Sequence, residues 1–189
     1  SHAQSEQCGS AYHPQFGQVA QCVVGLRPGP LPRQECQNWC WAACSESIFG
    51  LAGFQVDQTR FVEKVYGNAS RCEPANGPMI KNGIDGRWVD ERGRRFWANL
   101  QIVMDTFYGI GHPQPLAVVW NELNQGRALM TGALGHAVLI TAMEYIRTPA
   151  GPETTAVIVR DPWPGSPNRR LMTPQEFFNV SFLATLRLS

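Results

Sequence analysis

The feature that most constrains the fold of this chain is a cysteine-rich run that directly follows a proline-rich segment. Residues 27–33 contain three prolines and cannot be helical, because each proline removes a backbone N–H and blocks the preceding turn. Beyond them, apolar residues recur at helical spacing: Trp41, Ala42, Cys44, Ile48 and Phe49. The pattern predicts a helix over residues 38–51, with Asn38 as its N-cap and Cys40 in its first turn.

The remainder of the first half predicts a mixture of helix and loop. A short apolar run over residues 19–26 indicates a strand within an otherwise extended arm, residues 1–33. A second helix is expected from Asp57 to Tyr66, closed by Gly67 and Asn68. Residues 68–95 show little periodicity and are expected to form a long ordered loop. Apolar residues at helical spacing then predict a helix over residues 96–108.

The second half changes character. Residues 116–120 form a short apolar run, followed by a helical turn over residues 121–125. Segments rich in Val, Ile, Thr and Ala then predict antiparallel strands, at residues 128–131, 136–145, 154–160 and 182–188, with a turn at 149–152 and a short helix at 174–179. Helices followed by a sheet give an α+β domain. We expect one domain over residues 1–189: an arm (1–33), a helical lobe (34–110) and a β-sheet lobe (111–189).

Composition excludes some classes of partner. The 189 residues carry a net charge of +1 and are 43% hydrophobic, which suits a domain with a sizeable core. A near-neutral chain argues against nucleic acid or an anionic membrane as partner. No apolar run approaches the roughly 20 residues that span a bilayer.

Cys40 is the cysteine best placed to be a nucleophile. The thiolate is the reactive form of cysteine, and a helix N-terminus together with an imidazolium favours it. Gln34, six residues earlier on a loop, is placed to donate its side-chain N–H to the oxyanion formed when a thiolate attacks a carbonyl. Gln37 is a weaker candidate for that role.

His136 and Asp161 complete the predicted constellation. Of the four histidines, His136 alone opens an apolar strand after a glycine, Gly135, which permits close backbone approach. It is suited to act as general base. Asp161 ends the neighbouring predicted strand and can fix the tautomer of the imidazole. Asp105 and Asp57 are weaker alternatives for this third position.

Gln34 and the run Cys40-Trp41-Ala42-Ala43-Cys44 resemble the nucleophile segment of papain-like cysteine peptidases, above all bacterial ones. The resemblance implies a papain-like fold, in which an N-terminal helical lobe with a central nucleophile helix packs on an antiparallel β-sheet lobe. It also implies a disulfide between Cys36 and Cys72 that tethers the loop before the nucleophile. Asp161-Pro-Trp163 is similar to the family's Asn and following Trp-Gly, with an aspartate in place of the asparagine. Trp163 is then expected to cover the Cys–His pair, and Trp39 and Gly135 to face the substrate.

The other cysteines have structural interpretations. Cys8 and Cys22 flank a loop and can staple the N-terminal arm, and Cys44 is most simply a small buried residue. Spacing for a zinc site is absent from the sequence, and no metal or organic cofactor is expected. Six cysteines in 189 residues favour an oxidising destination, hence a secreted protein.

The sequence therefore predicts a cysteine peptidase that acts on a protein or peptide substrate through a thioester acyl-enzyme, as a bacterial secreted or effector enzyme with an inhibitor or immunity protein as a further partner. Two alternatives stay open. The same triad serves an amidase, deamidase or transpeptidase, for example on peptidoglycan. The chain can also be a non-catalytic binding module stapled by disulfides, with Cys40 in a structural role.

Overall fold

The computed structural model describes residues 3–189, with side chains from residue 6 onward, as an α+β fold built on one large antiparallel sheet. In chain order the elements are β1 (Ala3–His13), β2 (Gly17–Leu26), α1 (Cys40–Leu51), α2 (Gln58–Tyr66), α3 (Gly77–Ile84), β3 (Gly86–Val89), β4 (Arg95–Asp105), a 3₁₀ turn η1 (Thr106–Tyr108), α4 (Pro115–Asn124), β5 (Leu129–Ala133), β6 (His136–Thr148), β7 (Gly151–Arg160), β8 (Arg169–Leu171), α5 (Pro174–Phe178) and β9 (Val180–Leu188). The strand order is β1-β2-β6-β5-β9-β4-β3, with β7 on β6 and β8 on β7.

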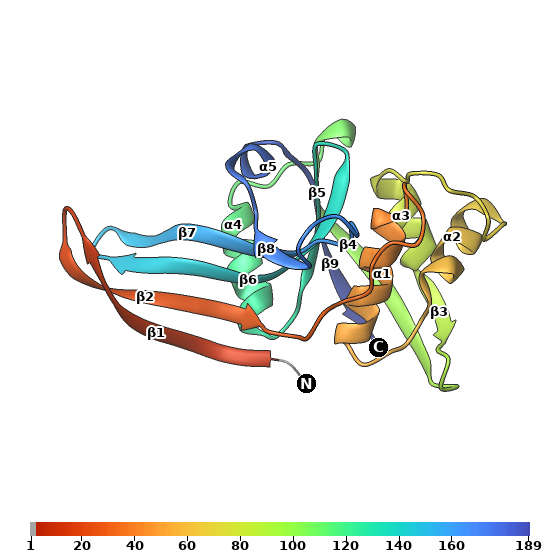
Figure 1. Ribbon diagram of the computed structural model, residues 1–189, viewed down its shortest axis with the longest axis horizontal. Coiled ribbons are helices and arrows are strands. Elements are labelled where there is room, and N and C mark those ends of the chain that lie inside the picture. Colours follow the sequence, from red (N-terminus) through yellow and green to blue (C-terminus); the bar gives the residue numbers. More distant parts are fainter. Residues whose placement is uncertain (1–2) are drawn as a thin grey trace.

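The sheet places the helices in two groups. Helices α1, α2 and α3 lie together at one end of the molecule, whereas β1, β2, β6 and β7 extend away from them as long ribbons (Figure 1). Helix α4 packs separately, against β2 and β6. The helical end and the ribbon end therefore meet at the beginning of β6 and the end of β7.

Strand β6 joins the two hydrophobic cores, because successive side chains of a strand point to opposite faces. Ala137 and Leu139 belong to the core that α1, α2 and α3 cover. Val138 and Ile140 belong to the second core, which includes Val119 of α4. Burial on both faces explains the continuous apolar run in the sequence of β6.

Helix α2 shows how local signals set a helix in this chain. The Asp57 side chain accepts a hydrogen bond from the N–H of Thr59, and Gly67 closes the helix in a left-handed conformation (φ 73°). Both are ordinary capping devices that satisfy free backbone groups. The prediction for residues 57–66 is confirmed.

The helix predicted over residues 96–108 is wrong, because this segment is strand β4. Phe96, Ala98 and Leu100 are buried in alternation with exposed neighbours, the period of a strand. Phe96 and Leu100 also fit a helical spacing together with Val103, Met104 and Phe107, and pairing with β9 decides between the two. Consequently the segment 34–110, predicted as a helical lobe, also supplies β3 and β4 to the sheet.

Three other expectations need correction. The loop predicted over residues 68–95 contains α3 and β3. Its signals were the N-cap Asn76, which accepts from the N–H of Met79, and Pro78 in the first helical turn. The apolar run at 116–120 and the turn after it form one helix, α4. The arm over 1–33 is a hairpin whose second strand joins the sheet through β6.

Both disulfides expected from the sequence are present. Cys8 and Cys22 lie directly opposite each other on β1 and β2, with Cα atoms 4.0 Å apart. Cys36 and Cys72 are joined across 36 residues. Cys40 and Cys44 keep free thiols, and Cys44 is buried as predicted. Within the described part of the chain, no helix is both long and apolar enough to cross a membrane.

Candidate active site

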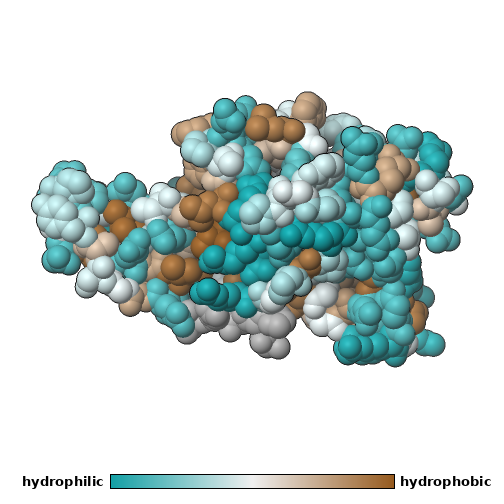
Figure 2. Space-filling view, viewed as in Figure 1, coloured by the Kyte–Doolittle hydropathy of each residue, from teal (hydrophilic) through white to brown (hydrophobic). Residues whose placement is uncertain are grey.

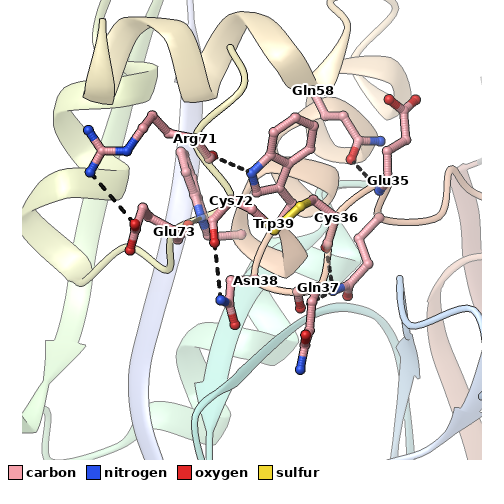
Figure 3. The surroundings of a disulfide bond; sticks show 11 residues. Glu35, Cys36, Gln37, Asn38, Trp39, Gln58, Arg71, Cys72 and Glu73 are labelled. Atoms are coloured by element: carbon pink, nitrogen blue, oxygen red, sulfur yellow. Dashed lines mark hydrogen bonds and ion pairs between the residues drawn. A yellow bond between two sulfur atoms is a disulfide. The ribbon is translucent and has the colours of Figure 1, made fainter. Parts of the chain in front are cut away.

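Cys40 is the first residue of α1, at a helix start that no side chain caps. The N-cap position is held by Trp39, whose side chain makes no capping hydrogen bond. Asn38, predicted to be the N-cap, instead donates its side-chain amide to the carbonyl of Cys72 (3.1 Å; Figure 3). The first N–H groups of a helix have no acceptor inside the helix. The N-terminus of α1 therefore offers free N–H donors and the positive end of the helix dipole beside the Cys40 thiol.

The loop before Cys40 is held by the segment after α2. The Cys36–Cys72 disulfide links the two, and the indole Nε1 of Trp39 donates to the carbonyl of Arg71 (2.8 Å; Figure 3). On the other side, the backbone N–H of Glu35 donates to Oε1 of the buried Gln58 (2.9 Å). These contacts fix the entry into α1 without using a capping side chain.

His136 reaches Cys40 from the opposite side because a tight turn delivers it. Ala133 and His136 are paired across β5 and β6, so only Leu134 and Gly135 form the turn. Both have positive φ, 54° and 76°, as a type I′ turn requires. Glycine adopts this conformation freely, whereas a leucine in it is strained by about 1 kcal/mol or more.

The imidazole of His136 lies between Cys40 and Asp161. Its Nε2 is 2.7 Å from Oδ1 of Asp161, which leaves Nδ1 for the Cys40 thiol. Burial by itself lowers the pKa of His136, but the hydrogen bonds to Asp161 and Cys40 outweigh burial and raise it to about 9. The backbone N–H of Ala137 also donates to the sulfur of Cys40 (3.4 Å). An imidazolium and an N–H donor therefore both face the sulfur.

Asp161 is buried and held as an anion. Burial favours its neutral form, but hydrogen bonds from His136 and the backbone N–H of Trp163 (2.9 Å), with Nε of Arg170 on Oδ2 (3.0 Å), lower its pKa to about 2. The prediction that the His136 and Asp161 strands are neighbours is confirmed, since β6 pairs with β7.

Arg170 helps to hold Asp161 in place, and it was not predicted from the sequence. Its guanidinium binds Asp161 through Nε and Glu176 through both terminal nitrogens (2.8 and 2.9 Å). Arg33 likewise donates to the carbonyls of Asp161, Trp163 and Ser166. Neither arginine lies in a recognisable pattern around Asp161, so no sequence signal pointed to them.

Gln34 lies buried in the loop before α1, but its amide is already engaged. Its Nε2 donates to the carbonyls of Gln37 (2.7 Å) and Cys36 (3.1 Å), and its Oε1 is buried without a partner among the described residues. Two bonds use both hydrogens of the amide. Gln34 must therefore exchange one of them before it can donate to an oxyanion. Gln37 is exposed.

The aromatic residues and Gly135 differ in their relation to the site. Trp39 is buried (6% exposed) and is absent from the walls of the adjoining cavity, and its contact with a substrate stays a prediction. Its indole packs in the core and its N–H donates to the carbonyl of Arg71. Trp163 is 40% exposed and lies two residues after Asp161, and Gly135 lines the cavity. The contacts of Trp163 and Gly135 with a substrate stay predictions.

A cavity of about 450 Å³ opens between Cys40 and His136. Its walls come from the start of α1, from residues 74–77, from η1 and from the β5–β6 turn. Asp105, a weaker candidate for the third position, lies in this cavity and makes no bond to His136, whereas Asp57 caps α2. Asp161 holds that position alone among the three.

The described residues offer one group of metal-ligand atoms, Glu6, Cys8 and Cys22. The two sulfurs form a disulfide and are not thiolates, so this group does not fit a metal site. The sequence was compared with protein-family models and with curated proteins, and neither comparison found a match.

Proposed function

We propose that this protein is a papain-like cysteine peptidase that uses Cys40, His136 and Asp161. One observation carries the proposal: a thiol at an uncapped helix start, facing an imidazole whose other nitrogen is 2.7 Å from a buried carboxylate. A nucleophile, a base and a group that orients the base, each within hydrogen-bond reach of the next, form the arrangement that thiol acyl transfer requires.

The reaction proceeds in two halves. The thiolate of Cys40 attacks the carbonyl carbon of a peptide bond, the C–S bond forms, and the carbonyl electron pair moves to oxygen. First-turn N–H groups of α1 stabilise this oxyanion, joined by Gln34 after one of its bonds is exchanged. The C–N bond then breaks, and imidazolium of His136 protonates the departing amine.

Hydrolysis of the thioester completes the cycle. Neutral His136 removes a proton from water, whose oxygen attacks the acyl carbon, and the C–S bond breaks to return the thiolate. Asp161 stays ionised throughout and stabilises the imidazolium, since its pKa is about 2. Arg170 and the N–H of Trp163 keep the carboxylate oriented.

Secretion is part of the proposal. Two disulfides are formed, and disulfides persist in oxidising compartments. A protein or peptide substrate fits the cavity beside Cys40, and an inhibitor or immunity protein would bind the same face.

Selective alkylation tests the nucleophile. Iodoacetamide at neutral pH is expected to modify Cys40 and leave Cys44 unmodified, because burial raises the pKa of Cys44 well above its ordinary value. Peptide mapping after limited reaction measures both. Cys44→Ala is the matched control and should label at the wild-type rate. An inert Cys40 in the folded protein favours the binding-module alternative.

A survey of protein N-termini tests the reaction. Extracts treated with the wild-type protein should contain new N-termini that are absent after treatment with Cys40→Ala. Their sequences would give the cleavage preference. If Cys40 is reactive and the two surveys are identical, the peptidase proposal fails and the amidase, deamidase or transpeptidase alternative replaces it.

A further inference from the structure

A buried carboxylate lies in the cavity beside Cys40 and has no partner among the residues whose side chains the structure describes. Asp105 is 2% exposed, lines the cavity, and its Oδ2 makes no hydrogen bond. No arginine, lysine or histidine among the described residues forms an ion pair with it. The other buried acids contrast with it, since Asp90, Glu122 and Asp161 each bind an arginine.

The fold holds this carboxylate in place through its backbone. Asp105 is the last residue of β4, is paired with Phe182 of β9, and exchanges two backbone hydrogen bonds with Ile110 (2.8 and 2.9 Å). The absence of a side chain at Gly77 makes room for it: a Cβ there would lie 2.1 Å from Oδ2. Gly77 is required by this close approach, because the neighbour is a carboxylate with a fixed backbone.

Leaving such a group unpartnered is costly for the protein alone. A buried polar atom without a hydrogen bond costs on the order of 1–3 kcal/mol, and a charged one costs more. Buried polar groups that the fold does not satisfy are uncommon and call for an explanation. A ligand that brings a cation or a hydrogen-bond donor to the carboxylate removes this free-energy cost. Such a ligand is therefore bound in preference to a ligand that lacks the group.

The walls of the cavity describe the remainder of the ligand. Ile80, Phe182 and Leu134 supply apolar surface around the approach to Asp105. Leu134 is 62% exposed and strained at φ 54°, so an apolar side chain is presented at the rim at a cost to the fold. Apolar walls and a carboxylate suit a side chain with an apolar stem and a cationic end.

We propose that Asp105 determines specificity, so that the enzyme selects peptides with an arginine or lysine within two residues before the bond that is cleaved. This inference rests on the proposed function, because it assigns the substrate class of the same site. The cation binds the Asp105 carboxylate, its stem packs on Phe182 and Leu134, and the scissile carbonyl reaches Cys40.

Peptide probes with a carbonyl electrophile test the preference. Two pairs of dipeptidyl chloromethyl ketones are used. The members of one pair differ only in arginine or leucine at the residue next to the ketone, and those of the other pair differ in the same way at the residue before it. The wild-type protein is expected to be labelled at Cys40 faster by at least one arginine probe than by its leucine partner. Asp105→Asn should reduce that ratio about 10- to 100-fold, the size expected for losing a charge-assisted bond, and leave labelling by the leucine probes within about twofold.

Two controls separate the outcomes. Glu73→Gln removes an exposed negative charge directly before Pro74, a residue of the cavity wall. This variant should keep the wild-type ratio of arginine-probe to leucine-probe labelling. Iodoacetamide, which fills no subsite, should label Asp105→Asn at the wild-type rate and so reports whether the site is intact. No labelling of Cys40 by any reagent defeats the proposed function. Labelling without an arginine preference at either position, or with a preference that Asp105→Asn keeps, overturns this inference alone.

Discussion

Helices α1 and α2 begin in opposite ways, although they belong to the same core. Helix α2 starts at Asp57, whose carboxylate accepts the N–H of Thr59. Helix α1 starts at Trp39 without a capping bond, and the polar residue beside it, Asn38, donates to Cys72. A capping side chain on α1 would stabilise the helix and would occupy the donors beside Cys40. The comparison indicates that α1 gives up local stability so that its first N–H groups stay free.

The two starts also differ in what faces them. The cap of α2 meets the backbone of its own helix and Glu91, whose Oε1 accepts the N–H of Asp57 (2.9 Å). The start of α1 meets β6 across the cavity, where His136 and the N–H of Ala137 approach the sulfur. If this difference is functional, changes beside the start of α1 should alter the reactivity of Cys40. Removal of the cap of α2, Asp57, should alter the stability of the fold alone.

Removal of the imidazole has the largest expected effect. His136→Ala should slow cleavage of a peptide substrate about 10²- to 10⁴-fold, the contribution of a general base, and should slow alkylation of Cys40. His112→Ala is the matched control, because His112 is exposed in a loop and outside the cavity. Rates of both reactions measure the effect, and equal losses for the two variants would contradict the assignment.

Loss of the Cys36–Cys72 disulfide should come next. Replacing both residues with serine frees a 36-residue loop and is expected to lower the free energy of unfolding by about 3–4 kcal/mol. Because this loop leads into α1, labelling of Cys40 should also slow. The double variant at Cys8 and Cys22 should lose about 3 kcal/mol, in urea denaturation, and keep the labelling rate. A labelling defect shared by both variants would remove the distinction.

Asp161→Asn should change the pH dependence of catalysis. The imidazolium that protonates the leaving amine persists to high pH, because the pKa of His136 is about 9. Wild-type kcat/KM should therefore fall as the pH rises through about 9, and in Asp161→Asn this fall should begin at lower pH. The rate at the optimum should drop as well, because the amide no longer stabilises the imidazolium. An unchanged alkaline limb would exclude Asp161 as the group that stabilises the imidazolium.

The same pair links stability to pH, and the signs are opposite for its two members. The pKa of His136 is raised from 6.5, so its contribution is complete below 6.5 and is lost as the pH rises through about 9. The pKa of Asp161 is lowered from 3.8, so its contribution is present above 3.8 and is lost as the pH falls toward about 2. The pair thus stabilises the fold most between these ordinary values.

The smallest expected effect is at the helix starts themselves. Asp57→Ala should lower the free energy of unfolding by about 1 kcal/mol and leave the reactivity of Cys40 unchanged, because it removes the cap of α2 and lies outside the cavity beside Cys40. Asn38→Ala removes only an exposed side-chain bond and should cost less. Urea denaturation of both variants measures this order, and a larger loss for Asn38→Ala would show that α1 is capped after all.

Prediction from the sequence succeeded where short-range physics decides. Asp57 and Gly67 mark the ends of α2, and the apolar runs of β5, β6, β7 and β9 lie where they were expected. It failed for β4, where one set of apolar residues fits both periods and the partner strand β9 is some 80 residues away. It could not place the indole of Trp39, because the carbonyl that its N–H meets, that of Arg71, depends on the course of a distant loop.

By itself the sequence determined the types of group that the site contains: a thiol at a helix start, a histidine opening a strand after a glycine, and an aspartate at the end of the next strand. Local rules suffice for this, because caps, turns and strand ends follow from nearby residues. Only the tertiary structure decided that Arg170 holds Asp161, that both hydrogens of Gln34 are engaged, and that Asp105 is buried against Gly77 with no partner in the described part of the chain. The approach of Asp105 to Gly77 joins separate segments of the chain, and burial and pairing of this kind exist only once such segments pack.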